Sequence, residues 1–177
     1  MADDDVVDGP VSLEECRRVL RSNAALAQLT DADVEALSPL IHLDEFAAGT
    51  VLFNESDPAN NFSVIATGTI ELYKTGSTGK KLTLNILHDG DLLGEMGLLN
   101  SAPRTATARA LTTARLLCFD SERFNAALDE GSLSAHRMVL AFARILAHRL
   151  TATDQELFDL FEADPDNPRF RGIREFK

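Results

Sequence analysis

The residues best suited to chemistry lie in one short segment of the chain. Gly94 permits a close approach of the backbone, and residues 95–99 are long enough for one helical turn whose free N–H groups can bind an anion. Arg104 adds a planar charged donor that suits two phosphate oxygens, and Thr105 adds a hydroxyl beside it. Glu95 is costly in an anion site unless it accepts from a neutral donor such as a sugar hydroxyl. The segment therefore predicts a site for a phosphate attached to a sugar.

Elsewhere the sequence shows no arrangement typical of catalysis or of metal binding. The four histidines are scattered, with no pair at metal-ligand spacing, and the two cysteines form no C-x-x-C pair. Cys118 stands in an apolar run, which favours a buried structural thiol over a nucleophile. There is no Gly-x-Ser-x-Gly or comparable catalytic motif. We therefore expect a binding protein rather than an enzyme, without a metal, and with free thiols that suit the reducing cytoplasm.

The composition limits the partners that the chain can have. Its 177 residues, 45% of them hydrophobic, are enough to bury one substantial core, so one main domain is expected. The net charge of -11 repels polyanions and disfavours nucleic acid as a partner. The N-terminus is acidic where a secretory signal is basic, and charged residues interrupt the long apolar stretches. We expect a cytoplasmic protein with no membrane partner.

Short strand-like runs surround the candidate site. They lie between His42 and Phe119, and turn residues such as Asp89-Gly90 separate them at nearly regular intervals. Alternation of apolar and polar residues within 69–73 and 82–86 indicates strands with one buried face. The pattern predicts an antiparallel barrel or double-sheet roll. The runs are 51–53, 62–66, 69–73, 82–87, 105–110 and 114–119.

Helical patterns flank the strands on both sides. Residues 11–39 have helical spacing, with Thr30 as the N-cap of a short second helix that ends near Pro39. Asp120 can cap another short helix, and a longer one is predicted over about 133–162 from its apolar residues at three- and four-residue steps. The predicted fold class is therefore α+β, an antiparallel β-roll or jelly-roll barrel flanked by N-terminal helices and a long C-terminal helix.

The candidate segment also resembles a known motif. Gly94-Glu95, a short apolar turn and then Pro103-Arg104-Thr105-Ala106-Thr107 resemble the phosphate-binding cassette of the cyclic-nucleotide-binding domain family, and the order of elements is similar over about 23–162. One departure is Ser56, which follows Glu55 where the family commonly has glycine, so a strained or differently shaped turn is expected there. The implied divisions are an acidic N-terminal segment with the start of the helical region (1–22), the cyclic-nucleotide-binding domain (23–132) with its β-roll at about 42–119, the long helix (133–163) and a polar tail (164–177).

The resemblance assigns a function to each residue of the cassette. It implies that Glu95 binds the ribose 2′-hydroxyl and that Arg104 binds the cyclic phosphate. The backbone of Gly94 and Met96 and the hydroxyl of Thr105 would complete the pocket, with Ala106 in the strand behind the phosphate. The implied ligand is cyclic AMP or cyclic GMP. A hydroxyl at the position of Thr105 suits either nucleotide, and cyclic AMP is favoured because the rest of the chain resembles bacterial receptors.

The long helix has two interpretations. Its apolar stripe packs on the roll, or part of it pairs with the same helix of a second subunit. A length of about 45 Å exceeds one face of a small roll and favours a homodimer. In bacterial transcription regulators with this domain the helix also meets the nucleotide base, and that resemblance places Thr153 and Asp154 at base-contacting positions. Leu157 and Phe158 are candidates for a lid over the base.

The length of the C-terminal tail limits how a ligand-induced change could be passed to a partner. Those regulators carry a helix-turn-helix domain after the long helix, and residues 164–177 are too short for one. We therefore expect a stand-alone receptor that does not bind DNA and signals to a downstream protein by a population shift, in which the helices after Asp120 repack over the ligand. The alternative is a ligand-independent dimerisation or protein-interaction scaffold of the same fold.

Overall fold

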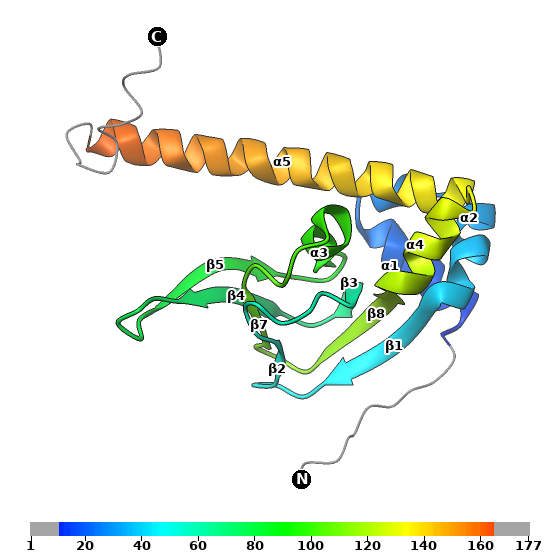
Figure 1. Cartoon of the computed structure of the whole chain (residues 1–177), viewed down its shortest axis with the longest axis horizontal. Coiled ribbons are helices and arrows are strands. Elements are labelled where there is room, and N and C mark those ends of the chain that lie inside the picture. The colour runs from blue at the N-terminus through cyan, green and yellow to red at the C-terminus, as the bar shows by residue number, and fades with distance from the viewer. Residues whose placement is uncertain (1–10, 165–177) are drawn as a thin grey trace.

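N-terminal helices, two sheets and one long helix follow one another in the computed structural model, which describes residues 11–164 (Figure 1). Within those residues, no helix has the length and apolar character needed to cross a membrane. The helices are α1 (Leu13–Ser22), η1 (Leu26–Gln28), α2 (Asp31–Leu37), η2 (Ser38–Leu40), α3 (Glu95–Asn100), α4 (Ser121–Asp129) and α5 (Leu133–Ala163). The strands are β1 (Ile41–Phe46), β2 (Val51–Phe53), β3 (Asn61–Thr67), β4 (Ile70–Thr75), β5 (Lys81–Leu87), β6 (Leu92–Leu93), β7 (Thr107–Ala110) and β8 (Ala114–Asp120).

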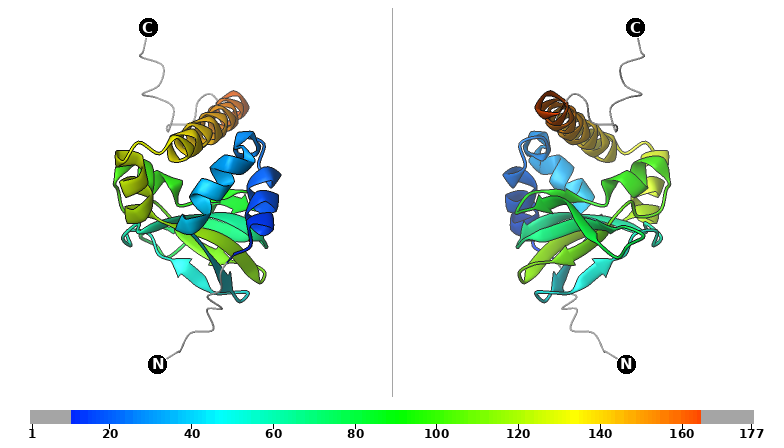
Figure 2. Two further views of the ribbon diagram at one scale, coloured as in Figure 1. Left: turned by 90° about the vertical axis from the view of Figure 1, so that its right-hand side faces the viewer. Right: turned by 90° about the vertical axis from the view of Figure 1, so that its left-hand side faces the viewer.

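Two antiparallel four-stranded sheets form a roll. The first has the strand order β1-β8-β3-β6 and the second has the order β2-β7-β4-β5. Consecutive strands such as β7 and β8 lie in different sheets, so the chain passes repeatedly from one layer to the other. The helices gather on one side of the sheets, and α5 crosses above them (Figures 1 and 2). This arrangement confirms the predicted fold class.

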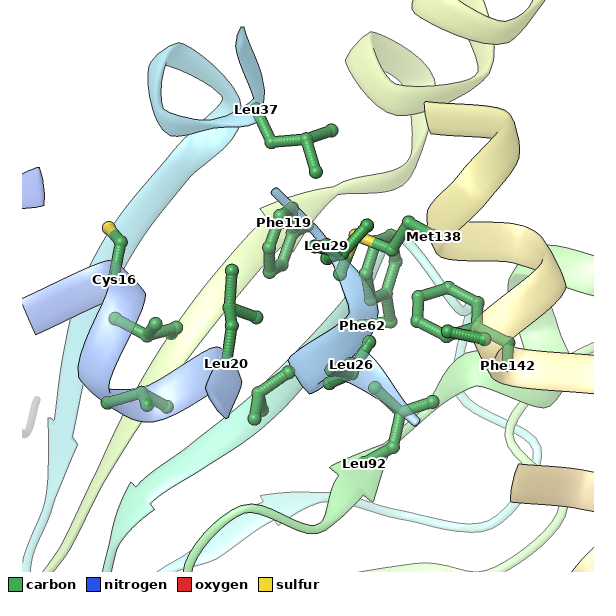
Figure 3. Packing of buried hydrophobic residues seen from close by; sticks show 14 of the residues in the cluster. Cys16, Leu20, Leu26, Leu29, Leu37, Phe62, Leu92, Phe119, Met138 and Phe142 are labelled. Atoms are coloured by element: carbon green, nitrogen blue, oxygen red, sulfur yellow. The ribbon is translucent and has the colours of Figure 1, made fainter. Parts of the chain in front are cut away.

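One hydrophobic core joins the first sheet to the helices (Figure 3). The rings of Phe62 and Phe119 stack with their centres 4.7 Å apart, and Phe142 of α5 meets Phe62 edge-on at 5.2 Å. Met138 of α5 is buried in the same core. Burial of each such side chain contributes about 1.5–3 kcal/mol. The core therefore fixes the first half of α5 on the roll.

A second core fills the space between the sheets. It contains residues from both layers, among them Ile65 of β3, Ile70 of β4 and Leu116 of β8. Cys118 of β8 belongs to this second core and Leu117 to the first, because successive side chains of a strand point to opposite faces. Cys118 is a free, buried thiol, as its apolar surroundings in the sequence predict.

Most elements predicted from the sequence are present, with differences at three strands. Thr30 and Asp120 cap α2 and α4 as predicted, because each side chain accepts from a backbone N–H of the first turn. β1 and β6 lie outside the predicted runs, since β1 mixes charged and apolar residues and β6 has only two residues. The predicted strand 105–110 begins at Thr107.

The first and last of the segments predicted from the sequence lie only partly within the described residues. Residues 1–10 of the N-terminal segment and 165–177 of the polar tail lie outside the described residues. Between them, the strands extend from Ile41 to Asp120 and the long helix from Leu133 to Ala163. The division into domains stays a prediction.

Candidate functional site

Gly94 allows the backbone and an arginine side chain to lie unusually close together. It is the N-cap of α3 and has a φ of 84°, a left-handed conformation that favours glycine. A Cβ atom here would lie 2.2 Å from Nη1 of Arg104 and 3.3 Å from the carbonyl oxygen of Asn61. Glycine is therefore required both by the backbone conformation and by the space that Arg104 occupies.

Arg104 is a buried cation with spare hydrogen-bonding capacity. The residue is only 7% exposed, and its guanidinium stacks 4.0 Å above the ring of Phe53. Nη2 donates to Oδ1 of Asn61 at 2.6 Å, whereas Nε and Nη1 are buried without a hydrogen-bond partner among the described residues. Burial lowers the pKa of Arg104, but an arginine keeps its charge in proteins. The site therefore holds a positive charge that an anion would satisfy.

A turn next to the second sheet holds the backbone of Arg104. The N–H of Arg104 donates to the carbonyl of Asp57 at 2.9 Å, and the N–H of Ser56 donates to the carbonyl of Arg104 at 2.8 Å. The N–H of Glu55 donates to Oγ1 of Thr107 at 2.9 Å. Ser56 has a φ of 72° in the left-handed region, which confirms the strained turn expected where the family commonly has glycine.

Glu95 connects the cassette to the long helix. The residue is 3% exposed, and its Oε1 lies 2.7 Å from Nη1 of Arg149 on α5. Nη2 of Arg149 also donates to the carbonyl of Leu92 at 2.9 Å. Burial raises the pKa of Glu95, and the charges of Arg149 and Arg104 oppose that rise. A carboxylate that already has one cationic partner can still accept from a hydroxyl, because it has two oxygens.

Arg149 was not predicted as a site residue. The available signal was its position on the long helix, one turn before the predicted base-contacting residues, but sequence alone does not give the crossing of α5 over α3. Phe53 and Asn61 carried no signal, since they reach Arg104 from strands that are distant in sequence.

The predicted cassette residues do meet around one pocket. All six of them line it, together with residues from two strands of the second sheet and from α5. Met96 and Thr105 are exposed at its edge, and Ala106 is buried immediately before β7. The lining consists of Phe53, Leu72, Leu93, Gly94, Glu95, Met96, Gly97, Arg104, Thr105, Ala106 and Arg149.

The four predicted helix residues lie elsewhere. Thr153, Asp154, Leu157 and Phe158 are exposed on α5 beyond Arg149, and none of them lines the pocket. The hydroxyl of Thr153 donates to the carbonyl of Arg149 within the helix. In this part of its course α5 extends away from the other helices (Figure 1). The structure thus unites Glu95, Arg104 and Arg149, and it leaves these four residues apart from them.

Comparison with known proteins gives a family match over the centre of the chain. The model of the family described as "Cyclic nucleotide-binding domain" matches residues 43–130, which includes the whole cassette. A solved structure, the N-terminal domain of a transcriptional regulator from Streptomyces coelicolor A3(2), is similar with a TM-score of 0.64 and 31% identity, covering 76% of this chain and 93% of that one.

Two curated relatives are similar over a large part of this chain. The HTH-type transcriptional regulator Cmr of Mycobacterium tuberculosis is 36% identical over 67% of this chain and 48% of its own length. The cyclic AMP receptor protein of Thermus thermophilus is 33% identical over 63% of this chain and 50% of its own length. The chain therefore spans about half the length of these relatives.

Proposed function

Because the chain belongs to the cyclic nucleotide-binding domain family, we propose that it is a receptor that binds cyclic AMP in the pocket of Arg104 and Glu95. The name of the Thermus relative, a cyclic AMP receptor protein, supports this nucleotide. Cyclic GMP is the competing ligand, since the hydroxyl of Thr105 suits either phosphate. We expect the ligand to be bound and released unchanged.

One observation carries the proposal: two nitrogens of Arg104 are buried and have no hydrogen-bond partner within residues 11–164. A buried cation with unmet donors is strongly unfavourable, and a phosphate supplies both the opposite charge and the acceptor oxygens. Gly94 and Met96, at the start of α3, line the same pocket, and the free backbone N–H groups of a helix start can bind an anion. This combination supports an anion in contact with Arg104, with Thr105 and Ala106 along its side.

The position of Glu95 supports a sugar beside the phosphate. A carboxylate in an anion site favours a ligand that also offers neutral donors, and a ribose 2′-hydroxyl is such a donor. Arg149 of α5 contacts the same carboxylate. A ligand hydroxyl bound to Glu95 would therefore alter the hydrogen bonds of Arg149, which connects α5 to the pocket. We propose that ligand binding thereby shifts the population of α5 positions.

Contacts to the base would need such a movement. Thr153 and Asp154 remain our candidates for the base, and Leu157 and Phe158 for a lid, although all four are exposed beyond the pocket. A repacking of α5 toward the roll would bring its second half over the ligand. The exposed surface of α5 would then present the signal to a second copy or to a downstream protein.

The names of the relatives extend the range of partners. Because one of them is called an HTH-type transcriptional regulator, the comparison lends no support to the expectation that DNA is not a partner. A partner protein, DNA or both remain compatible with the same ligand-induced change.

Calorimetry with cyclic AMP and cyclic GMP tests the proposal. We expect cyclic AMP to bind with one site per chain, and Arg104→Ala to weaken binding by about 100-fold or more, because two charge-assisted hydrogen bonds are removed. Arg115→Ala is the matched control, since Arg115 pairs with Glu15 and Glu45 outside the pocket. Circular dichroism verifies that each variant is folded, and chromatography of the recovered nucleotide verifies that it is intact.

Two results would contradict the proposal. Unchanged affinity in Arg104→Ala would mean that the nucleotide occupies another pocket. No binding of either nucleotide by folded wild-type protein at physiological concentrations would leave the ligand-independent scaffold as the better explanation.

A further inference from the structure

A polar row crosses the inner face of the first sheet, and none of its residues lines the nucleotide pocket. In the antiparallel register His42 of β1 is opposite Cys118 of β8, which in turn is opposite Ser63 of β3. Asp44 lies two residues after His42 and so points to the same face of β1. Cys118 belongs to the core between the sheets, which shows that this row faces the interior of the roll.

Three of these side chains bring different ligand atoms together. One imidazole nitrogen of His42, one carboxylate oxygen of Asp44 and Sγ of Cys118 all lie within 4.8 Å of one another. Nε2 of His42 is 3.6 Å from Oδ2 of Asp44. In a tetrahedral zinc site with bonds of about 2.0–2.3 Å, neighbouring ligand atoms are about 3.3–3.6 Å apart. Small side-chain adjustments would therefore suffice to enclose an ion.

We propose that His42, Asp44 and Cys118 form a site for a divalent ion of the zinc type. Nitrogen, carboxylate oxygen and thiolate sulfur are the three ligand classes that zinc uses, and a thiolate among them selects against magnesium and calcium. A thiolate and a carboxylate also balance the two charges of the ion, so the loaded site adds no net charge to the interior of the roll.

The exposure of the ligands provides a route for the ion. The side chain of His42 is 41% exposed and that of Asp44 is 18% exposed, whereas Cys118 is fully buried behind them. The ion would enter past His42, and a water molecule from the same side would supply a fourth ligand. Such a three-ligand site with one open position is a common arrangement for zinc.

Coordination changes the protonation of the thiol. A free thiol ordinarily carries its proton at neutral pH, and Sγ of Cys118 lies 3.1 Å from Oγ of Ser63. When a metal–sulfur bond forms, the S–H bond breaks and the proton passes to solvent, so one proton is released for each ion bound. No oxidant or reductant is involved.

This proposal departs from the expectation, drawn from the scattered histidines, that the chain holds no metal, and it rests on the cluster of His42, Asp44 and Cys118. His42 and Cys118 are far apart in sequence, and only the pairing of β1 with β8 brings them together. A motif search depends on local spacing, whereas this cluster depends on strand register.

Cobalt titration of chelator-treated, tag-free protein tests the site. We expect one Co²⁺ per chain, with the intense near-ultraviolet band of thiolate-to-cobalt charge transfer and the visible bands of tetrahedral cobalt, both lost on addition of Zn²⁺. Cys118→Ser should abolish the charge-transfer band. Cys16→Ser is the matched control, because Cys16 is the other buried free cysteine and should leave the band unchanged.

A second pair of variants avoids the core. His42→Ala should weaken zinc binding at least tenfold in competition with a chromophoric chelator, and His136→Ala, at an exposed histidine of α5, should not. Absence of the charge-transfer band in wild-type protein would overturn the proposal, as would persistence of that band in Cys118→Ser or equal zinc affinity in His42→Ala and wild type. Arg104→Ala should still bind the ion, so the test stands apart from the test of the nucleotide pocket.

Discussion

At the level of single residues, the site depends on the absence of a side chain at Gly94. The backbone there is left-handed, and the space that a Cβ would need is already filled by Nη1 of Arg104. The close approach keeps the guanidinium against the start of α3, and Gly94, Met96 and Arg104 line one pocket. Gly94 therefore contributes by positioning the guanidinium, and Arg104 contributes its positive charge.

Gly94→Ala separates these contributions. We expect it to weaken binding of cyclic AMP at least about tenfold, because the new Cβ displaces Arg104, and to cost about 1–2 kcal/mol of stability through its left-handed backbone. Gly79→Ala is the control, since Gly79 has a φ of 77° and a Cβ there meets no atom within 4 Å. Calorimetry and urea denaturation measure both. If the two variants lose affinity equally, backbone strain and not the displaced guanidinium is the cause.

The residues of the site differ in how far the sequence predicts them. Glu95 and Arg104 were recognisable because their charges lie beside a glycine and a helical turn in one short segment, and this local geometry survives in the structure. Arg149 was not, because its contact with Glu95 depends on the path of a helix that packs through Met138 and Phe142. Site residues that are close together in sequence can be recognised from the sequence, whereas contacts between distant elements depend on how the whole core packs.

At the level of elements, one buried carboxylate joins the N-terminal helices to α5. Asp33 closes the capping box of α2 with Thr30, and it also accepts from Oγ of Ser134 at 2.8 Å and from Nη1 of Arg137 at 2.9 Å. Burial opposes its ionisation, but the hydrogen bonds from Thr30, Ser134 and Arg137 outweigh that cost and hold the pKa of Asp33 well below its ordinary value. The position of α5 thus depends on a charge in α2.

Asp33→Asn tests this joint through its pH dependence. At pH 7 we expect a loss of about 2 kcal/mol in the free energy of unfolding, because hydrogen bonds to a charged acceptor are weakened. Since the folded pKa is depressed, the contribution of Asp33 is complete above the unfolded value of about 3.9 and is lost as the pH falls toward the folded value. Urea denaturation at pH 7 and near pH 3 should therefore show a smaller difference from wild type at the lower pH.

A neighbouring carboxylate provides the control for this experiment. Asp31 lies in the same first turn of α2, but it is exposed and pairs with Arg17 and Arg21 at the surface. We expect Asp31→Asn to change stability by less than about 1 kcal/mol. A pH-independent difference between Asp33→Asn and wild type would show that shape, and not charge, holds the joint.

The elements themselves were predicted unevenly, for physical reasons. Helix ends were accurate where a capping side chain precedes the first turn, as at Asp120 and Thr30. β1 was missed because the alternation of residues 41–44 is short and stops at Glu45, and because its pairing with β8 is distant in sequence. The same strand carries two of the proposed metal ligands, so the site and the strand were hidden for one reason.

At the level of the whole molecule, α5 has two different halves. Met138 and Phe142 are buried in its first half, while Arg149 holds its middle to Glu95 and Leu92. Beyond Arg149 the helix carries exposed apolar side chains at Leu157, Phe158 and Leu160. An exposed apolar stripe on a helix of 31 residues is typical of a surface that pairs with another helix.

Self-association through this stripe is therefore expected. Leu140, Ala147, Leu150 and Leu157 are exposed and recur at seven- and three-residue steps, the spacing of a two-stranded coiled coil. Sedimentation velocity at micromolar concentrations should show a dimer, and Leu150→Glu combined with Leu157→Glu should give a monomer, because facing helices would bury unpaired carboxylates. Leu111→Glu, at an exposed leucine between β7 and β8, should leave the dimer intact. A monomeric wild type, or a doubly substituted protein that still sediments as a dimer, would exclude this helix as the interface.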